Sequence, residues 1–368
     1  MTLGFLFYLM VFVIAGALIR RRRLTNGPDV SDPTVREPIL PAEWPVPSAS
    51  RLLLMSAPAL GSIIVWTASR NRALDAGHGD IAVLWLITIA LANLAVSWPV
   101  QRPALARFPA WVRIYRYVLT AVAALTVAAL FIRTVALDRY TWLYSSDEGA
   151  FGIRAVDVLN GKLKNPFATS WFSHPTMWFF LQAQFMRLFG DGVAGTRVLS
   201  AVMGTATIPV TYLYVRRHMG IPTALTAAAL VGVFHVHVFW SRNALNNISS
   251  AFFVVLVLWL LDRVIDEWRP RDALLAGLAI GISQFGYASN HLLFALPLVY
   301  LAYAVIAALP RTREALEVVG YKVLSRGVLI AAGAFLGMLP LAAYYVDHAE
   351  ESKSRMREVS IFAAGWLE

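Results

Sequence analysis

Apolar stretches alternate with short polar or basic segments along most of the chain. A helix needs roughly 20 apolar residues to cross a bilayer core of about 30 Å, and most of the stretches approach that length. The pattern predicts ten membrane-spanning helices, near residues 3–19, 51–68, 81–99, 117–136, 193–215, 222–240, 249–265, 273–288, 292–309 and 327–347. The expected fold is therefore an all-α, polytopic membrane protein with about ten transmembrane helices.

Basic clusters between these stretches orient the chain. The four arginines at 20–23 follow the first predicted span, and strict alternation of the spans puts the later clusters on the same side. These clusters are Arg102, Arg107, Arg113 and Arg116; Arg216 and Arg217; Arg269 and Arg271; and Arg311, Arg313, Lys322 and Arg326. Because short loops rich in lysine and arginine stay in the cytoplasm, we expect residues 137–192 and 348–368 to lie outside it.

Residues 137–192 form the longest gap between predicted spans and contain two amphipathic patterns. In DEGAFGIRAVDVL the apolar residues recur at helical spacing, which predicts a helix that lies in the membrane interface and ends at Asn160-Gly161. A second such helix is expected over 176–189, ending at Gly190. Tyrosine and tryptophan residues around both segments are typical of headgroup depth.

The proline-rich stretch 24–50 predicts an irregular connection that divides the chain. We expect an accessory N-terminal span at 1–19, a cytoplasmic linker at 20–50, additional membrane spans at 51–116, a membrane core at 117–347 and an external segment at 348–368. Because the chain ends soon after the last predicted span, we expect this sequence to be a truncated form of a longer protein.

Composition agrees with a membrane protein and excludes several classes of function. Of the 368 residues, 58% are hydrophobic and 15% are charged, and the mean hydropathy of +0.60 is too high for a soluble domain of this size. The net charge of +10 lies mostly in the clusters between spans, which argues against nucleic-acid binding. Without cysteine, the chain has no disulfide, no thiolate nucleophile and no cysteine metal site.

Two adjacent carboxylates, Asp147 and Glu148, begin the first amphipathic segment. Ser145 and Glu148 fit a capping box, and acids in a first helical turn suit the helix dipole, so capping alone explains Glu148. Asp147 has no part in that box and would lie where an unpaired carboxylate is costly. It shares one side of the helix with Arg154. A carboxylate beside a cation is a candidate general base for a hydroxyl acceptor.

Three cationic positions at the predicted outer membrane face are candidate phosphate contacts. His174 precedes a proline at the start of the second amphipathic segment, while Arg197 and Arg242 lie near the outer ends of two spans. Each has an ordinary alternative, which is an interfacial histidine at a turn or an arginine that reaches the lipid headgroups. The functional interpretation is a clamp on a diphosphate or phosphate leaving group.

Amides and further polar residues are predicted at the same face. Asn243 and Asn246 cluster at a short outer turn, where they either cap the next helix or hydrogen-bond sugar hydroxyls. Tyr287, Asn290 and His291 fall at the outer turn of a later hairpin. The convergence of these groups on one face is a stronger indication of a site than any one of them.

Two other patterns concern metal binding and helix packing. His235 and His237 are two residues apart and would point to nearly opposite sides of a helix, which argues against a shared metal ion. The glycine spacings at 277–281 and 333–337 permit close contact between helices in lipid.

The order of the motifs along residues 140–310 is distinctive. They occur in the strings SSDEGAFGIRAVDVLNGKL, SHPTMWFFLQAQFMRLFGDGVAGTRVLSAVMGTATIPVTYLYVRR, HVFWSRNALNNISSAFFVVLVLWLL and DALLAGLAIGISQFGYASNHLLFALP. This order resembles that of the GT-C superfamily of integral-membrane glycosyltransferases. Within it, the resemblance is to the dolichyl-phosphate-mannose-protein mannosyltransferase group, which contains protein O-mannosyltransferases and the lipid A aminoarabinose transferase.

The resemblance implies a catalytic core within 117–347 that transfers a sugar from a polyprenyl-phosphate donor to an acceptor hydroxyl on the extracytoplasmic face, with inversion. It implies that Asp147 is the base, with Glu148 beside it. His174 is then a donor-phosphate contact, and so more weakly is His291. We expect the phosphate set to include Arg197 and Arg242 as well, and the substrate-binding residues to be Arg154, Trp171, Asn243, Asn246, Tyr287 and Asn290.

Many members of the superfamily have a second acid where this chain has Asn246 and Asn247. This departure argues against a two-carboxylate metal site, so we expect no cofactor and no required divalent metal. The expected partners are a polyprenyl-phosphate sugar, an acceptor lipid, polysaccharide or protein, and membrane lipids, at the cell membrane of a prokaryote.

Two alternatives stay open. A transporter or flippase of lipid-linked saccharides would use a similar groove, but it would place ionisable groups near the bilayer midplane on broken helices. A catalytically silent GT-C scaffold would fit the missing second acid. The sequence leaves the sugar, the length of the lipid and the acceptor undetermined.

Overall fold

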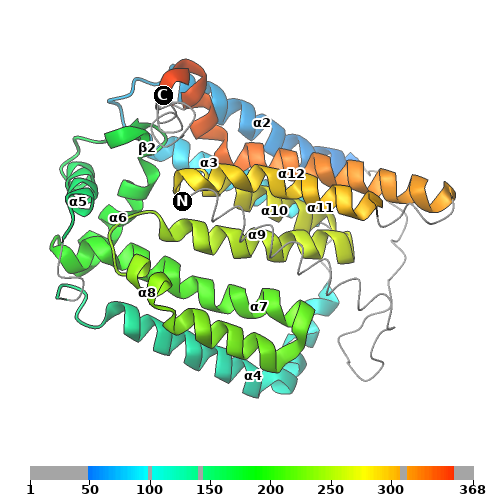
Figure 1. Ribbon diagram of the computed structural model, residues 1–368. Coiled ribbons are helices and arrows are strands. Elements are labelled where there is room, and N and C mark those ends of the chain that lie inside the picture. The colour runs from blue at the N-terminus through cyan, green and yellow to red at the C-terminus, as the bar shows by residue number, and fades with distance from the viewer. Residues whose placement is uncertain (1–48, 98–101, 140–143, 307–312, 352–368) are drawn as a thin grey trace, which may run out of the picture.

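A computed structural model describes residues 49–97, 102–139, 144–306 and 313–351 and is almost entirely helical (Figure 1). The α-helices are α2 (Ala49–Asn71), α3 (Gly79–Ser97), α4 (Arg102–Thr134), α5 (Ser146–Leu159), α6 (Met177–Phe189), α7 (Val193–Val233), α8 (His235–Ser241), α9 (Ile248–Glu267), α10 (Pro270–Ser283), α11 (Ala295–Ile306) and α12 (Arg313–Asp347). Two 3-10 helices, η1 (Trp171–Ser173) and η2 (Ala288–Phe294), and one antiparallel pair of short strands, β1 (Thr169–Ser170) and β2 (His174–Pro175), complete the described elements. The predicted all-α fold is confirmed.

Six of the described helical segments are long and apolar enough to cross a membrane. They are Gly79–Ser97, Val112–Thr134, Val193–Val233, Ile248–Glu267, Ala288–Ile306 and Glu317–Asp347. The chain is therefore a polytopic membrane protein. The predicted span 3–19 lies outside the described residues, and each of the other predicted spans overlaps a helix.

Helix α7 contains two predicted spans because it reverses direction at Gly220. This glycine has φ 80° and ψ −179°, a conformation that residues with a side chain rarely adopt. Ala224 of the second limb shares a buried hydrophobic cluster with Ile208 of the first, and Figure 1 shows the two limbs running back along each other. The predicted spans 193–215 and 222–240 are thus the limbs of one hairpin, and the second limb continues into α8.

The predicted interfacial helices are α5 and α6, which lie together at one end of the helix bundle (Figure 1). The capping box of α5 is confirmed, since Glu148 N–H donates to Ser145 Oγ at 3.2 Å and Ser145 N–H donates to Glu148 Oε2 at 3.4 Å. The predicted end of α6 is also confirmed, at Gly190 with φ 92°. Local sequence signals therefore set the bounds of both helices.

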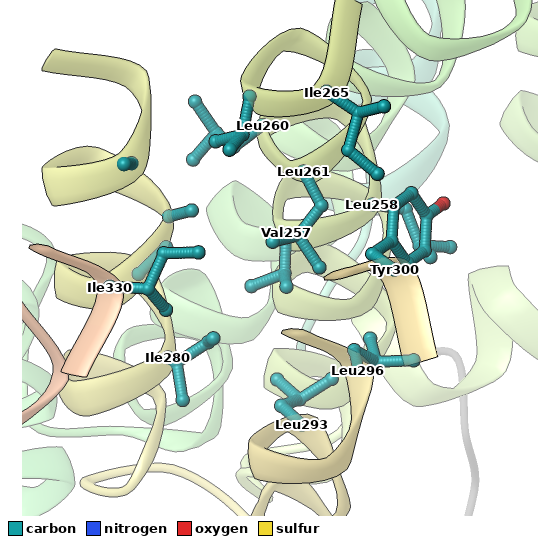
Figure 2. Packing of buried hydrophobic residues seen from close by; sticks show 14 of the residues in the cluster. Val257, Leu258, Leu260, Leu261, Ile265, Ile280, Leu293, Leu296, Tyr300 and Ile330 are labelled. Atoms are coloured by element: carbon teal, nitrogen blue, oxygen red, sulfur yellow. The ribbon is translucent and has the colours of Figure 1, made fainter. Parts of the chain in front are cut away.

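The largest hydrophobic cluster surrounds α9. Figure 2 shows Val257 and Leu261 of α9 between Ile280 of α10 and Tyr300 of α11. Lipid tails are as apolar as these side chains, so van der Waals packing and close helix contact stabilise such a bundle more than transfer from water does.

The glycine spacings bring the backbones of α10 and α12 into direct contact. A Cβ atom added to Gly277 would lie 2.1 Å from the carbonyl oxygen of Ile330, and one added to Gly281 would lie 2.1 Å from that of Ala334. Both distances are far below van der Waals contact, so no side chain fits at either position. The predicted close helix contact is present.

Helices α2 and α3 pack against α12 and α10 near the loop that precedes α6. The Trp85 indole donates to the carbonyl of Leu336 at 2.8 Å. Its ring meets Phe167 and Phe285 edge-on, at centroid distances of 5.8 and 5.6 Å. Phe167 belongs to the loop between α5 and α6, so this aromatic cluster anchors the loop on the bundle.

Candidate active site

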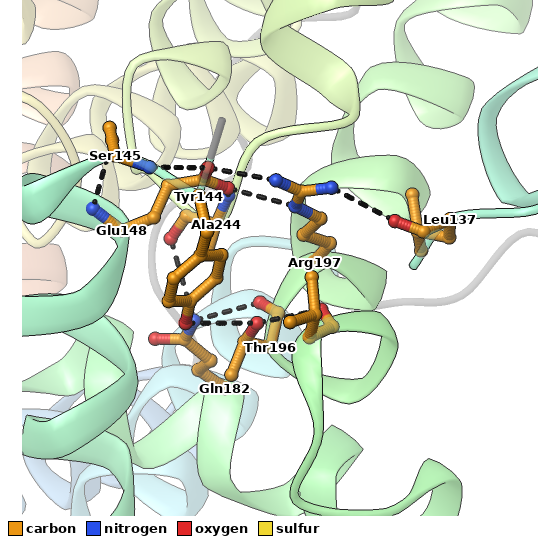
Figure 3. A network of polar contacts seen from close by, with 9 residues as sticks. Leu137, Tyr144, Ser145, Glu148, Gln182, Thr196, Arg197 and Ala244 are labelled. Atoms are coloured by element: carbon orange, nitrogen blue, oxygen red, sulfur yellow. Dashed lines mark hydrogen bonds and ion pairs between the residues drawn. The ribbon is translucent and has the colours of Figure 1, made fainter. Parts of the chain in front are cut away.

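Glu148 and Arg197 form a buried ion pair that joins α5 to α7 (Figure 3). Arg197 donates through Nε and Nη2 to the two carboxylate oxygens, each at 2.9 Å, and both side chains are 1% exposed. The N–H of Ala244, after α8, donates to the same carboxylate at 2.7 Å. Arg197 Nη1 also donates to the carbonyl of Leu137, after α4, at 3.0 Å. A buried charge pair is stable only when its remaining hydrogen-bonding groups are also paired, and this arrangement meets that condition.

Arg242 binds the end of α4 in a similar way. Its Nη1 donates to the carbonyl of Ile132 at 2.7 Å. Its Nη2 donates to the carbonyls of Val135 and Ala136 at 2.9 and 3.1 Å. The last carbonyls of a helix have no partner within the helix, so a buried arginine at this place satisfies them.

Asp147 differs from its neighbour Glu148 because its side chain is exposed. Within the described part of the chain, no hydrogen bond or ion pair reaches its carboxylate. Arg154, which the helical spacing puts on the same side, instead pairs with Asp157 through a contact of 3.1 Å between Nη1 and Oδ2. The capping box fixes the backbone of this helical turn, and the Asp147 carboxylate that it carries is open to a ligand.

His174 lies on β2, in the strand pair between α5 and α6. Its partner across the pair is Ser170 of β1. The buried imidazole stacks on the Trp171 ring at 5.9 Å and meets the Phe151 ring edge-on at 5.1 Å. Phe151 lies one turn after Asp147, so α5 both presents the open carboxylate and supports the imidazole.

The tip of this hairpin carries backbone strain. Phe172 has φ 50° and ψ 41°, and Ser173 has φ 54°. The left-handed region costs about 1–2 kcal/mol for a residue with a side chain. Strained conformations of this kind persist where the surrounding structure imposes them, and they cluster at functional sites.

The C-terminal end of α12 and the residues directly after it hold the base of the hairpin. The Thr169 hydroxyl donates to the Glu351 carboxylate, and the Tyr344 hydroxyl donates to the same oxygen at 2.7 Å. The sequence analysis did not identify these residues. Tyr344 and Glu351 lie 175 and 182 positions after Thr169 in the chain. No local sequence pattern indicates contacts between residues so far apart.

Two buried amides occupy the region next to His174. Asn246 Nδ2 donates to the carbonyl of Gly286 at 3.1 Å and lies 3.5 Å from His174 Nδ1. Asn290 Nδ2 donates to the carbonyl of Ser283 at 2.8 Å. Both side chains are 1% exposed, yet neither Oδ1 atom has a hydrogen-bond partner among the described residues. Buried acceptors of this kind are uncommon, and they usually meet water or a ligand.

Further predicted contacts surround these amides. His291 Nδ1 lies 2.5 Å from Gln284 Oε1, and the Gln284 side chain also donates to the backbone of Asn290 at 3.2 Å. The N–H of Tyr287 donates to Ser249 Oγ at 3.1 Å. The turn after α10 and the start of α9 therefore meet at this place.

The structure sorts the predicted site residues into two sets. The Glu148 network consists of Glu148, Arg197 and Arg242. The His174 group consists of Trp171, His174, Asn246, Tyr287, Asn290 and His291. Asp147 lies on α5, which contacts both sets, whereas Arg154 joins neither. Asn243 is buried directly after Arg242 in the chain.

The described residues include no group of three or more His, Cys, Asp or Glu side chains placed to hold a metal ion. The polar atoms of the His174 group come mainly from amides and imidazoles, which suit the recognition of hydroxyl and phosphate groups.

Residues 173–337 match the family model described as dolichyl-phosphate-mannose-protein mannosyltransferase. This match supports the GT-C glycosyltransferase group for the chain. The predicted resemblance is thus confirmed, and the family supports a membrane glycosyltransferase of the GT-C type. Neither a curated protein nor a solved structure matches the chain.

The bounds of the match bear on the site. The matched part of the chain begins within the hairpin of β1 and β2 and ends within α12, so it includes the His174 group apart from Trp171. It leaves out all of α5, with Asp147 and Glu148. The two carboxylates are therefore tied to the matched part only by the contacts of α5.

Proposed function

We propose that this GT-C glycosyltransferase moves a sugar from a polyprenyl-phosphate donor to an acceptor hydroxyl on the extracytoplasmic face, with inversion and without a metal ion. The observation that supports this proposal best is the open carboxylate of Asp147 on the same helix that packs against His174. A base on a fixed helical turn and a buried group of hydrogen-bonding atoms are what a displacement at a sugar carbon needs.

In the proposed reaction Asp147 accepts the proton of the acceptor hydroxyl. The acceptor oxygen forms a bond to the anomeric carbon while the bond from that carbon to the phosphate oxygen breaks. The electron pair of that bond leaves with the lipid phosphate. Attack and departure on opposite faces of the sugar ring give inversion.

His174 and His291 are the proposed phosphate contacts. The phosphate leaves as a stable anion, so donors that stabilise its charge reduce the need for a protonating acid. Packing on Trp171 and Phe151 fixes the His174 ring, which avoids reorganisation during the reaction.

Asn246 and Asn290 are the proposed sugar contacts. Their Oδ1 atoms are acceptors without a donor among the described residues, and sugar hydroxyls are donors. Trp171 and Tyr287 would line the same place as aromatic surfaces.

The proposal gives Glu148, Arg197 and Arg242 a positioning role in place of the direct roles expected from the sequence. The donors of Arg197 reach Glu148 and Leu137, and those of Arg242 reach the end of α4. Glu148 already accepts from Arg197 and Ala244. Glu148 and Arg197 hold α5 in place, and with it Asp147, while Arg242 holds the end of α4.

Reconstitution with a polyprenyl-phosphate sugar and candidate acceptors tests the proposal. We expect Asp147→Asn to lower transfer by about 10²- to 10⁴-fold, the usual contribution of a general base. Asp157→Asn is the matched control, because it neutralises an acid of the same helix that is paired with Arg154. Full transfer by Asp147→Asn excludes the base assignment, and retention of configuration in the product excludes single displacement.

A second measurement concerns the metal and the membrane face. We expect transfer to persist after treatment with a chelator, and to require acceptor on the extracytoplasmic side of oriented proteoliposomes. Loss of activity that added Mg²⁺ or Mn²⁺ restores contradicts the metal-free mechanism.

A further inference from the structure

A cavity of about 420 Å³ lies between the C-terminal ends of α2 and α12, and it shares no residue with the His174 group. It is lined by Trp66, Thr67, Arg70, Asn71 and Asp347. All five residues fall outside the segment that matches the mannosyltransferase family, which ends at residue 337. The family match therefore does not include this cavity.

The cavity lies at the same end of the bundle as the His174 hairpin, because Tyr344 and Glu351 on either side of Asp347 contact the hairpin base. One turn before Thr67, the α2 surface becomes apolar, with Ile63 and Ile64 60% and 52% exposed. A polar cavity directly above an exposed apolar helix surface has the layering of a lipid headgroup region.

The apolar surface continues onto the second helix of the cavity. The Trp66 ring packs on Phe335 of α12 at a centroid distance of 5.8 Å, and Phe335 is itself 49% exposed. Acyl chains that follow this surface would bring their headgroup to the cavity, with the Trp66 ring at the boundary.

The cavity presents one cation and one anion, and both have unused hydrogen-bonding capacity. Arg70 donates through Nε and Nη2 to the two carboxylate oxygens of Asp347, at 3.0 and 2.7 Å. No bond joins its Nη1 to another residue of the described chain. Each Asp347 oxygen accepts one of these bonds, although a carboxylate has about four acceptor sites. The two side chains are 40% and 39% exposed, so a ligand can reach both.

We propose that this cavity binds the headgroup of a zwitterionic phospholipid, with its phosphate on Arg70 and its ammonium on Asp347. The two charges of such a headgroup lie a short distance apart, so they can meet the adjacent charges of the paired Arg70 and Asp347 side chains at the same time. An anionic headgroup would satisfy Arg70 but meet repulsion from Asp347. A primary ammonium, as in phosphatidylethanolamine, can also donate hydrogen bonds to Asp347, whereas a trimethylated ammonium cannot.

Native mass spectrometry of the detergent-purified full chain tests this proposal. The protein is incubated with phosphatidylethanolamine, phosphatidylcholine and phosphatidylglycerol of identical acyl chains, and bound copies are compared. We expect phosphatidylethanolamine to bind best, and Arg70→Gln to lower its binding roughly fivefold, as for an exposed charged contact. Asp347→Asn should reverse the preference toward phosphatidylglycerol, because it removes the repulsion and the ammonium partner together.

Arg72→Gln is the matched control. Arg72 forms an equally direct ion pair with Asp80, but neither residue lines the cavity. Thr67→Trp supplies an uncharged variant that fills the cavity and leaves the ion pair intact, and it should lower binding of all three lipids. Equal headgroup preference in wild type, Arg70→Gln and Asp347→Asn overturns the proposal, as does stronger binding of phosphatidylglycerol by the wild type. These readouts are independent of sugar transfer, so failure here leaves the proposed activity untouched.

Discussion

The Glu148 network and the His174 group both contact α5, but they use their polar atoms differently. In the Glu148 network, both oxygens of the carboxylate meet donors, and the guanidinium of Arg197 reaches two separate elements. In the His174 group, Asn246 and Asn290 each leave a buried oxygen without a donor among the described residues. Both regions are buried and polar, and only one is satisfied by the protein itself.

This difference separates support from recognition. A satisfied buried network stabilises one arrangement of helices, and removal of one partner leaves an uncompensated group. An unsatisfied acceptor carries a free-energy penalty that a ligand can relieve. We therefore expect substitutions in the Glu148 network to affect stability first, and substitutions in the His174 group to affect transfer first.

Glu148→Gln should have the largest effect on stability. It leaves the buried Arg197 guanidinium without its counter-charge, which typically lowers the free energy of unfolding by about 3–5 kcal/mol. Thermal unfolding in detergent, followed by circular dichroism or intrinsic fluorescence, measures the change. Asp147→Asn, at the adjacent exposed position, should change stability by less than about 0.5 kcal/mol. Similar unfolding midpoints for the two variants would contradict the distinction between the neighbouring acids.

His174→Phe should mainly affect transfer. Phenylalanine keeps an aromatic ring between Trp171 and Phe151 but removes the ring nitrogens that we place against the phosphate. Loss of one such donor lowers turnover by roughly 10²-fold. Single-turnover assays with saturating donor measure it. A stability loss as large as that of Glu148→Gln, with turnover intact in the folded fraction, would make His174 a packing residue.

Asn246→Ala should have a smaller effect, mainly on substrate binding. It removes an unpaired oxygen together with the bond to Gly286 and the 3.5 Å contact with His174 Nδ1, so the change in stability should stay near 1 kcal/mol. The loss of one sugar contact should raise KM for the donor by roughly tenfold. Asn93→Ala is the control, because it removes a comparable amide bond of 3.0 Å to the Ile89 carbonyl on α3. Equal KM values for the two variants would remove Asn246 from the sugar site.

Phe172→Gly should have the smallest net effect on stability. Glycine adopts the left-handed conformation of this position without strain, which offsets its greater entropy in the unfolded chain by about 0.5–1 kcal/mol. The substitution also removes the edge-on contact of the Phe172 ring with Trp171 at 4.7 Å, which is of similar size. Ala136→Gly is the control, since Ala136 has φ 45° in the turn after α4, outside the hairpin. If the strain positions His174, only Phe172→Gly should lower transfer. Identical activity of the two variants would limit the strain to local geometry.

The elements were predictable because their signals are local. Apolar runs located the helices, Ser145 and Glu148 set the start of α5, and Gly190 marked the end of α6. The glycine spacings of α10 and α12 indicated a close contact, although they did not identify the partner helix. The candidate site was predicted in composition only, since the sequence put His174, Asn246 and Asn290 at one membrane face without their mutual contacts.

The unpredicted features join distant parts of the chain. Glu148 and Arg197 are 49 positions apart, and Arg70 and Asp347 are 277 apart. The role of Glu351 at the hairpin base was not anticipated, because its contacts depend on where the end of α12 lies relative to β1. Pairings of this kind follow from helix packing, and no periodicity or cap encodes them.

The sequence by itself determined that this protein is a polytopic helical membrane protein, because hydrophobic length and charge placement are properties of the chain, and the order of its motifs indicated the GT-C group. It also placed Asp147 and Glu148 side by side at the start of one helix. Only the tertiary structure decided that Glu148 is buried against Arg197 while Asp147 stays open. The physical reason is that burial is set by what packs against a helix face, and α7 and the segment after α8 cover the face of α5 that carries Glu148.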